Sequence, residues 1–233
     1  SFEHDHERVK KLWDIWQSCL KTDNSIPLEH TLGNHDIWGW NKKKSGTTGE
    51  EARWGKRWAM DALGLSKPYR TFDKAGWRFV ILDSVFPNGD GYVGRLDDEQ
   101  FAWLEGLLKQ TPASTPVLVL SHIPILTITA FTSPKKDVVP RHEGSASEMM
   151  SDMPKLVKLF ARHRNVRTCL SGHIHQIDRV DFQGVSYFCN GAVCGAWWKG
   201  PNGDCDEGYA IVDLYDDGSV ERVYKTYGWI ARE

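Results

Sequence analysis

Three short segments of the chain carry the side chains best suited to chemistry. They are Gly33-Asn34-His35-Asp36, Ser121-His122-Ile123-Pro124 and Ser171-Gly172-His173-Ile174-His175. Taken one at a time, each has a structural explanation, because asparagine and histidine are common in turns bounded by glycine. Taken together, their imidazole nitrogens and amide oxygen suit zinc, manganese, iron or nickel better than calcium. The three segments therefore indicate a metal site.

Each segment follows an apolar run that is predicted to form a β-strand. These runs cover residues 27–33, 117–120 and 166–170. Ligands in α/β folds collect in the loops after the carboxyl ends of strands. In an extended segment, the spacing of His173 and His175 would place both imidazoles on one side, where they could serve two adjacent ions.

The elements that must position these segments alternate between strand and helix at first and become antiparallel strands later. A helix is predicted over the first twenty residues, followed by a surface excursion over residues 41–66. Asp97 is expected to cap a second helix, with Gln100 three residues on in a capping-box pattern. A loop to about residue 145 precedes the third helix. The remaining predicted elements are a buried strand at 77–82, a helix near 148–163, and short strands at 179–182, 185–189, 209–214 and 220–226.

This order of elements favours an α/β fold, and more narrowly a layered α-β-β-α sandwich in which helices flank two mixed sheets. No internal repeat, low-complexity tract or long linker divides the chain. We therefore expect a single domain that covers residues 1–233, a length that can bury a substantial core.

The composition narrows the partners and leaves the compartment open. A formal net charge of -2 gives no reason to expect a nucleic-acid polymer or an anionic membrane as partner. No apolar run approaches the length that crosses a bilayer, so no membrane span is expected. The chain begins at Ser1 and not at Met, so the sequence leaves open both a cytoplasmic location and export from a longer precursor.

The five cysteines do not follow a metal-binding or disulfide pattern. Their number is odd and no two of them have CxxC spacing, which argues against a zinc ribbon and a dense disulfide framework. Most are expected to be buried thiols. A bridge from Cys194 to Cys189 or to Cys205 would need an oxidising compartment.

The three motifs together resemble those of the calcineurin-like metallophosphoesterases, near the cyclic-nucleotide phosphodiesterase and purple acid phosphatase branches. GNHD at 33–36 and GHIH at 172–175 match the family pattern, and SHIP at 121–124 stands where the family usually has GHxP. The segments at 69–84 and 96–108 are similar as well, so the resemblance spans roughly residues 28 to 215.

The resemblance implies a role for each motif residue. It implies two divalent ions (manganese, iron, zinc or nickel) and a small phosphoester substrate. Asn34, His122 and His173 would bind one ion, and His175 would bind the other. His35 would protonate the leaving oxygen or steady the phosphoryl group. Asp36 would orient His35 and fix its tautomer.

Two motifs of the family are not found before Gly33: an early Asp-x-His (or Asp-x-Asp) and a Gly-Asp, which supply further ligands. His4-Asp5-His6 is the nearest candidate, but it opens a helix, and the helix dipole explains acidic residues there better than metal binding does. The expectation is a fold that lacks its first strand-helix-strand unit. Such a chain would bind one ion or none and would be a poor or inactive catalyst. Its open sheet edges and apolar surface would favour self-association.

Two other functions stay open. A mononuclear metal hydrolase would use His122, His173 and His175 at one ion. A non-catalytic binding module on a degenerate phosphoesterase scaffold would explain the missing carboxylates.

The sequence does not identify the substrate. Phosphodiesters, phosphomonoesters and cyclic nucleotides all remain candidates. Two tryptophan pairs could contact substrate, Trp38 with Trp40 and Trp197 with Trp198. The run Lys42–Lys44 could face a phosphate, although a solvated loop explains it better.

Overall fold

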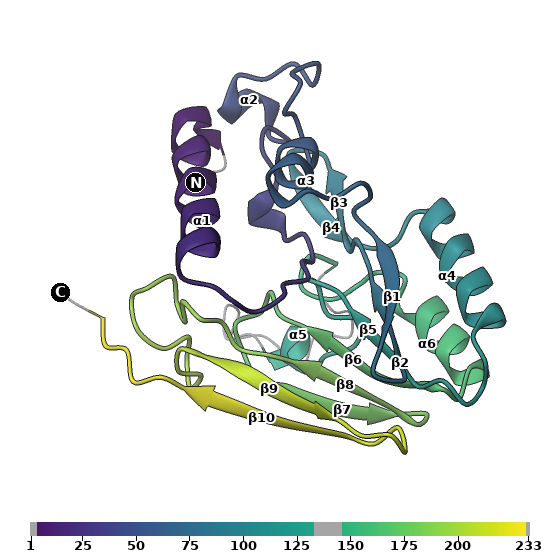
Figure 1. Cartoon of the computed structure of the whole chain (residues 1–233). Coiled ribbons are helices and arrows are strands. Elements are labelled where there is room, and N and C mark those ends of the chain that lie inside the picture. Colours follow the sequence, from purple (N-terminus) through teal and green to yellow (C-terminus); the bar gives the residue numbers. More distant parts are fainter. Residues whose placement is uncertain (1–3, 133–145, 232–233) are drawn as a thin grey trace.

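A six-stranded mixed sheet forms the centre of the structure. The computed structural model describes residues 4–132 and 146–231, so the predicted loop to about residue 145 lies partly outside the described residues. The strands are β1 (Arg70–Lys74), β2 (Trp77–Ile81), β5 (Val117–Leu120), β6 (Val166–Ser171), β7 (Asp178–Phe182) and β8 (Val185–Cys189). They run in the order β1-β2-β5-β6-β8-β7, as Figure 1 shows. The four central strands are parallel, and β1 and β7 pair antiparallel at the two edges.

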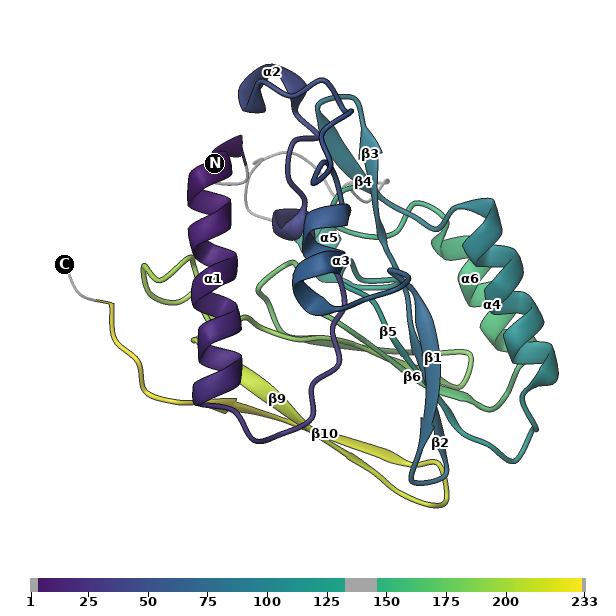
Figure 2. The ribbon, with the colours of Figure 1, turned by 45° about the horizontal axis from the view of Figure 1, so that its top comes forward.

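Helices α4 (Asp98–Gln110) and α6 (Met153–Arg162) cover one face of this sheet and lie side by side in Figures 1 and 2. Sheet strands alternate their side chains between the two faces, so one set of strand side chains points toward the helices. This set forms one core with the apolar faces of α4 and α6. The core residues from the two helices are Leu104, Leu108, Leu156, Val157, Leu159 and Phe160. They pack against Val80, Val117, Val119 and Val166 of the sheet.

The start of α4 fulfils half of the predicted capping box. The side chain of Asp97 accepts a hydrogen bond from the backbone N–H of Gln100 at 2.8 Å, as expected. The side chain of Gln100 does not complete the box. It is fully buried, and it donates to the carbonyl of Asp83 and accepts from the N–H of the same residue, both at 2.9 Å. Gln100 therefore fastens α4 to the end of β2.

A two-stranded ribbon covers the opposite face of the sheet. Strands β9 (Gly208–Leu214) and β10 (Val220–Thr226) pair antiparallel. The indole N–H of Trp77 donates to the carbonyl of Tyr215 at 3.1 Å, and Arg222 lies 5.1 Å from the ring centroid of Phe188. The layers are thus helices, mixed sheet and ribbon. The mixed α/β class is confirmed, with the second sheet present as an antiparallel ribbon in the described residues.

Helix α1 (His6–Thr22) lies beside α3 (Arg57–Leu63), away from α4 and α6 (Figure 2). Val9 packs against Trp38 and Trp58, and Gln17 donates to the carbonyl of Ala62 at 2.8 Å. The predicted first helix and the surface excursion, which includes the short α2 (Lys42–Ser45), are both present. The outer side of α1 leaves apolar side chains in solvent, with Leu12 41%, Ile15 49% and Trp16 45% exposed.

Several boundaries differ from the sequence prediction. Residues 27–33 form no strand, because no neighbouring strand among the described residues lies along them to complete a hydrogen-bond ladder. The hairpin of β3 (Val85–Asn88) with β4 (Gly91–Gly94) and the short α5 (Thr129–Thr132) were not predicted. Helix α6 begins at Met153 and not near 148, with Pro154 in its first turn, a position that proline tolerates.

All five cysteines are free thiols, so neither candidate bridge forms in the structure. Burial raises the pKa of Cys169 and raises that of Cys189 to about 12, which keeps both thiols protonated and unreactive. Within residues 4–132 and 146–231, no helix combines the length and the apolar character that a membrane crossing requires.

Candidate functional site

The three predicted motifs meet at the carboxyl edge of the mixed sheet. The turn η2 (Asn34–Asp36), the loop after β5 and the loop after β6 contribute to one cavity of about 680 Å³. A fourth segment, the loop between β8 and β9, closes its side. The cavity is lined by Asn34, His35, Tyr92, His122, Thr129, Ser147, Glu148, His173, Ile174, His175, Gln176, Trp197, Asn202, Gly203 and Asp204.

Three of the predicted ligands touch one another. Nε2 of His122 lies 2.8 Å from Oδ1 of Asn34 and 3.0 Å from Nδ1 of His173. An amide oxygen and two imidazole nitrogens therefore converge on one point. Gly33 permits this approach, because a Cβ atom there would lie 2.9 Å from Cε1 of His122.

The hydrogen-bond partners indicate which ring nitrogen of His173 and of His175 carries the proton. Nε2 of His173 lies 2.7 Å from the carbonyl of Ser147, and Nδ1 of His175 lies 2.6 Å from the carbonyl of Gly195. A carbonyl oxygen only accepts, so these nitrogens carry the protons in the neutral rings. Neutral His173 then presents the lone pair of Nδ1, and neutral His175 presents that of Nε2. Fixing a tautomer through the second ring nitrogen is typical of metal-binding histidines.

The surroundings favour neutral histidines. Burial lowers the pKa of His122 well below its ordinary value, and the neighbouring His173 adds to the effect. Burial also lowers the pKa of His173 to about 4, against the opposing hydrogen bond from the ring to Ser147. Neutral imidazole is the form that binds metal.

Both histidines of the HxH pair have left-handed backbone, with φ of 72° at His173 and 59° at His175. The segment is therefore not extended, and the condition under which both imidazoles would lie on one side is not met. The backbone turns at each histidine, and the two side chains have separate partners. Such conformations cost free energy in residues other than glycine and collect at functional sites.

Asp36 shapes the turn that carries Asn34 and His35. Its Oδ2 accepts a hydrogen bond from the N–H of Gly33 at 2.7 Å, and burial raises the pKa of its carboxyl group. The ring of His35 lies at the cavity wall, 4.6 Å from that of Trp197. The role of Asp36 in orienting His35 stays a prediction.

The other candidate segments lie elsewhere. Asp5 caps α1 by accepting from the N–H of Arg8 at 3.0 Å, and the ring of His6 packs against Trp38 and Trp58. This segment therefore begins a helix, and Asp5 acts as its N-cap. Lys42–Lys44 are exposed on α2 and do not line the cavity.

The sequence did not single out several residues that line the cavity. The hydroxyl of Tyr92 lies 3.4 Å from Nε2 of His173, and burial together with the charge of Glu148 raises the pKa of Tyr92. Asn202 donates to the carbonyls of Ile174 and His175 at 3.1 and 3.2 Å. The only sequence signal for Asn202 is its place in the turn-rich Pro-Asn-Gly-Asp stretch, which indicates a loop and no partner.

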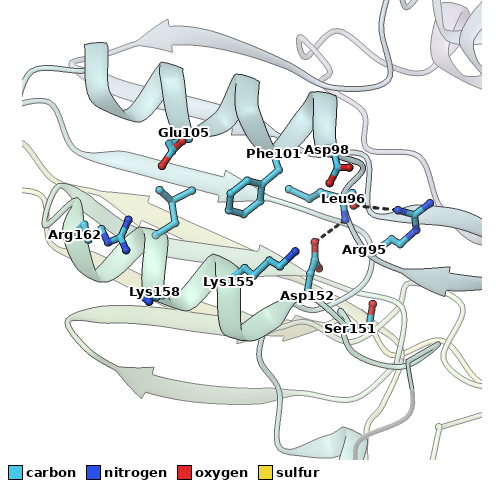
Figure 3. Close-up of a pocket in the computed structure, with 11 residues that line it drawn as sticks. Arg95, Leu96, Asp98, Phe101, Glu105, Ser151, Asp152, Lys155, Lys158 and Arg162 are labelled. Carbon is cyan, nitrogen blue, oxygen red and sulfur yellow. Dashed lines mark hydrogen bonds between the residues drawn. The ribbon is translucent and has the colours of Figure 1, made fainter.

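A second cavity of about 530 Å³ lies between α4 and α6, on the helical side of the sheet (Figure 3). Asp98, Phe101 and Glu105 face it from α4, and Lys155 and Lys158 face it from α6. It contains no histidine or cysteine, and its charges of both signs do not form a ligand set. The residue types that could bind a metal therefore lie in the first cavity.

The donor set fits one ion better than two. Asn34, His122 and His173 offer an amide oxygen and two imidazole nitrogens at a common point. In the described part of the chain, no three His, Cys, Asp or Glu side chains converge to hold an ion. A second ion near His175 would therefore need ligands that these residues do not provide.

Comparison with known proteins matches this geometry to a family. The model of the calcineurin-like phosphoesterases matches residues 5–177, which contain all three motifs. The chain belongs to this family. It is 29% identical over 144 residues to a protein of Synechococcus sp. named probable cyclic nucleotide phosphodiesterase, covering 62% of this chain and 49% of that protein. The chain spans about half the length of the curated relatives that it matches.

Two solved structures share the calcineurin-like fold with this chain. A dimetal phosphatase from Danio rerio aligns with a TM-score of 0.55 at 15% identity, over 88% of this chain and 71% of the other. Purple acid phosphatase PPD1 from yellow lupin aligns with a TM-score of 0.53 at 15% identity, over 79% of this chain and 34% of the other. These likenesses show that the chain has the same fold as the two structures.

Proposed function

We propose that the protein hydrolyses a phosphoester at a metal centre built on Asn34, His122 and His173. The observation that carries this proposal is the contact of Nε2 of His122 with both Asn34 and His173, from three separate loops of the sheet edge. A bound divalent ion would polarise the phosphoryl oxygen and lower the pKa of a bound water. The family membership supports metal-dependent phosphoester chemistry in general.

The remaining motif residues have roles around that centre. His175 would contribute Nε2 to a second ion, since its Nδ1–H is engaged with Gly195. His35 would hold the proton that the leaving oxygen takes up, because its ring lines the same cavity. Asp36 would keep the turn in shape and orient His35 through it.

We also propose that this chain alone is a slow catalyst with one well-formed ion site. Support comes from the donor set, which offers three converging atoms for one ion and leaves His175 without converging carboxylates among the described residues. Candidate substrates are phosphodiesters and phosphomonoesters. A cyclic nucleotide is among them, because the Synechococcus relative is named for that activity.

Hydrolysis of bis-p-nitrophenyl phosphate by the manganese-loaded chain tests the proposal, with metal content measured on the same sample. We expect about one ion per chain, slow turnover, and loss of activity with a chelator or with His122→Ala. His163→Ala, at the end of α6, is the matched control and should change neither property.

Other outcomes would favour the alternatives. Hydrolysis of carboxylic esters but not of phosphodiesters would favour a mononuclear metal hydrolase. Metal binding without hydrolysis of any phosphoester would favour a binding module. Turnover at the rate of a two-ion enzyme, with two ions per chain, would contradict the proposed single well-formed site.

Self-association is a separate proposal, and the outer side of α1 supports it. Leu12, Ile15 and Trp16 recur at helical spacing there and are each more than 40% exposed. We expect light scattering to give a mass above 26.5 kDa at high concentration. The variant Ile15→Lys should return the chain to a monomer, and an unchanged mass would exclude this face.

A further inference from the structure

Trp197 stands at the cavity wall between the two histidines that are not part of the three-ligand cluster. Its ring centroid lies 4.6 Å from that of His35 at an interplanar angle of 84°, and 5.4 Å from that of His175 at 40°. The side chain is 47% exposed although it lines the cavity. Part of the indole is therefore accessible to solvent beside these histidines.

The loop that carries Trp197 is fastened to the turn that carries the histidines. Asn202 donates to the carbonyls of Ile174 and His175, and Gln176 donates to the carbonyl of Asn202. The ring of His175 donates to Gly195, two residues before Trp197. These contacts fix the loop on both sides of the indole, so its position relative to His175 is built into the fold.

The backbone also indicates that this position is imposed. Trp197 and Trp198 have φ of 62° and 64°, in the left-handed region that bulky side chains avoid. Such strain persists where the surroundings over-determine the conformation. Here those surroundings include the hydrogen bonds that join the loop of Trp197 to the turn of His173 and His175.

We propose that Trp197 is a specificity-determining residue that stacks on an aromatic group of the phosphoester, such as an aryl ester or a nucleobase. This inference rests on the proposed function, because the phosphoryl group must sit at the metal centre for its substituent to reach the indole. The substrate class would then be aromatic phosphoesters, and compact alkyl phosphoesters would bind more weakly.

Trp198 provides a matched control from the next position. It shares the left-handed backbone and is 53% exposed, but its ring packs against Trp229, 5.3 Å away, and it does not line the cavity. A substitution of Trp198 perturbs the same loop without removing the indole at the cavity wall.

The test compares phenylphosphonate with methylphosphonate, two probes that are not hydrolysed. Their affinities for the zinc-supplemented chain are measured by calorimetry. Methylphosphonate binding reports the phosphoryl site alone. We expect phenylphosphonate to bind about tenfold more tightly, which is the size of one aromatic stacking contact.

The variants separate stacking from packing. Trp197→Leu, which keeps apolar bulk, should remove the tenfold preference and leave methylphosphonate affinity unchanged, whereas Trp197→Phe should retain most of it. Trp198→Leu should leave both affinities as they are. Equal affinities for the two probes in the parent chain would overturn the role of Trp197, as would a preference that survives in Trp197→Leu.

Failure of the proposed function would look different. If methylphosphonate does not bind while phenylphosphonate binds through Trp197, the proposed function is wrong, and the role of Trp197 in phosphoester specificity falls with it. If neither probe binds, both proposals are wrong.

Discussion

Oδ1 of Asn34 lies 2.8 Å from Nε2 of His122, although 88 residues separate the two in the sequence. Among the described residues no strand precedes the turn of Asn34, whereas His122 lies two residues after the end of β5. Their contact therefore depends on tertiary packing of the turn against the sheet edge.

The first prediction concerns this contact. Asn34→Ala removes the amide oxygen and leaves the two imidazoles, so zinc affinity should fall at least about tenfold, the usual size for lost support at a metal site. Calorimetry with zinc measures the loss. Asn24→Ala is the control, because Asn24 caps its own exposed turn through Ile26. Unchanged zinc affinity in Asn34→Ala would remove Asn34 from the ligand set.

Gly33→Ala should damage the same centre by steric overlap. The added Cβ would lie 2.9 Å from Cε1 of His122, whose ring is held by two neighbours. We expect the free energy of unfolding to fall by about 1–3 kcal/mol, the usual cost of overpacking, with weaker zinc binding. Gly106→Ala, in the open interior of α4, should instead add roughly 0.5–1 kcal/mol. Urea unfolding of both variants decides the matter.

The buried ion pair of Lys56 with Asp83 should show a large asymmetry between single and double substitution. Side-chain exposure is 15% and 4%, and burial lowers the pKa of Lys56 and raises that of Asp83. Asp83→Asn leaves a buried ammonium and should cost about 3–5 kcal/mol of unfolding free energy. Adding Lys56→Met should recover most of that loss.

The control for this pair is Lys10 with Asp14 on the outside of α1, where the side chains are 50% and 59% exposed. Asp14→Asn should change the unfolding free energy by less than about 0.5 kcal/mol. If Asp83→Asn and Asp14→Asn lower the unfolding free energy by similar amounts, burial does not determine the cost of breaking these ion pairs.

Asp152 should contribute to the pH dependence of stability. Its side chain accepts a hydrogen bond from the N–H of Leu96 at 2.9 Å, in the cavity between α4 and α6 (Figure 3). Burial raises the pKa of its carboxyl group, so the folded protein holds this proton at a pH where the unfolded chain has released it. The contribution of Asp152 to stability is then largest below pH 3.8, its ordinary value, and declines as the pH rises through the raised folded pKa.

Asp152→Asn keeps an acceptor for Leu96 and removes the ionisation. The variant should melt at a higher temperature than the parent at pH 7, and this advantage should shrink toward pH 4. Thermal unfolding followed across that range measures the difference. If the difference in melting temperature grows toward acidic pH, the raised pKa assigned to Asp152 is contradicted.

Sequence patterns predicted the elements that depend on local signals. The apolar run at 117–120 and the cap at Asp97 depend on neighbours within a few residues, and both are present. The strand predicted at 27–33 does not form, because a strand needs a partner that the local sequence does not reveal. Likewise, Gln100 matched a local capping pattern, but its buried side chain forms a hydrogen bond with the backbone of Asp83, 17 residues away.

The features of the site also divide into those that the sequence predicted and those that depend on the folded structure. The family resemblance implied that Asn34, His122 and His173 share one ion, and the three side chains do lie together. It did not predict the tautomer of His173, because the carbonyl of Ser147 that fixes it comes from a loop without a motif. Nor did it predict the left-handed backbone of His175, which only the folded turn imposes.

The double hydrogen bond from Asn202 to the carbonyls of Ile174 and His175 also bears on how the molecule opens. If the loop around Asn202 separates from the sheet, both carbonyls lose their partner at once, and the ring of His175 loses Gly195. The wall of the cavity and the histidine turn therefore form one cooperative unit of local unfolding. Amide hydrogens in the two segments should exchange with solvent through a shared opening event, so any solution condition that loosens the wall also disorganises the histidines.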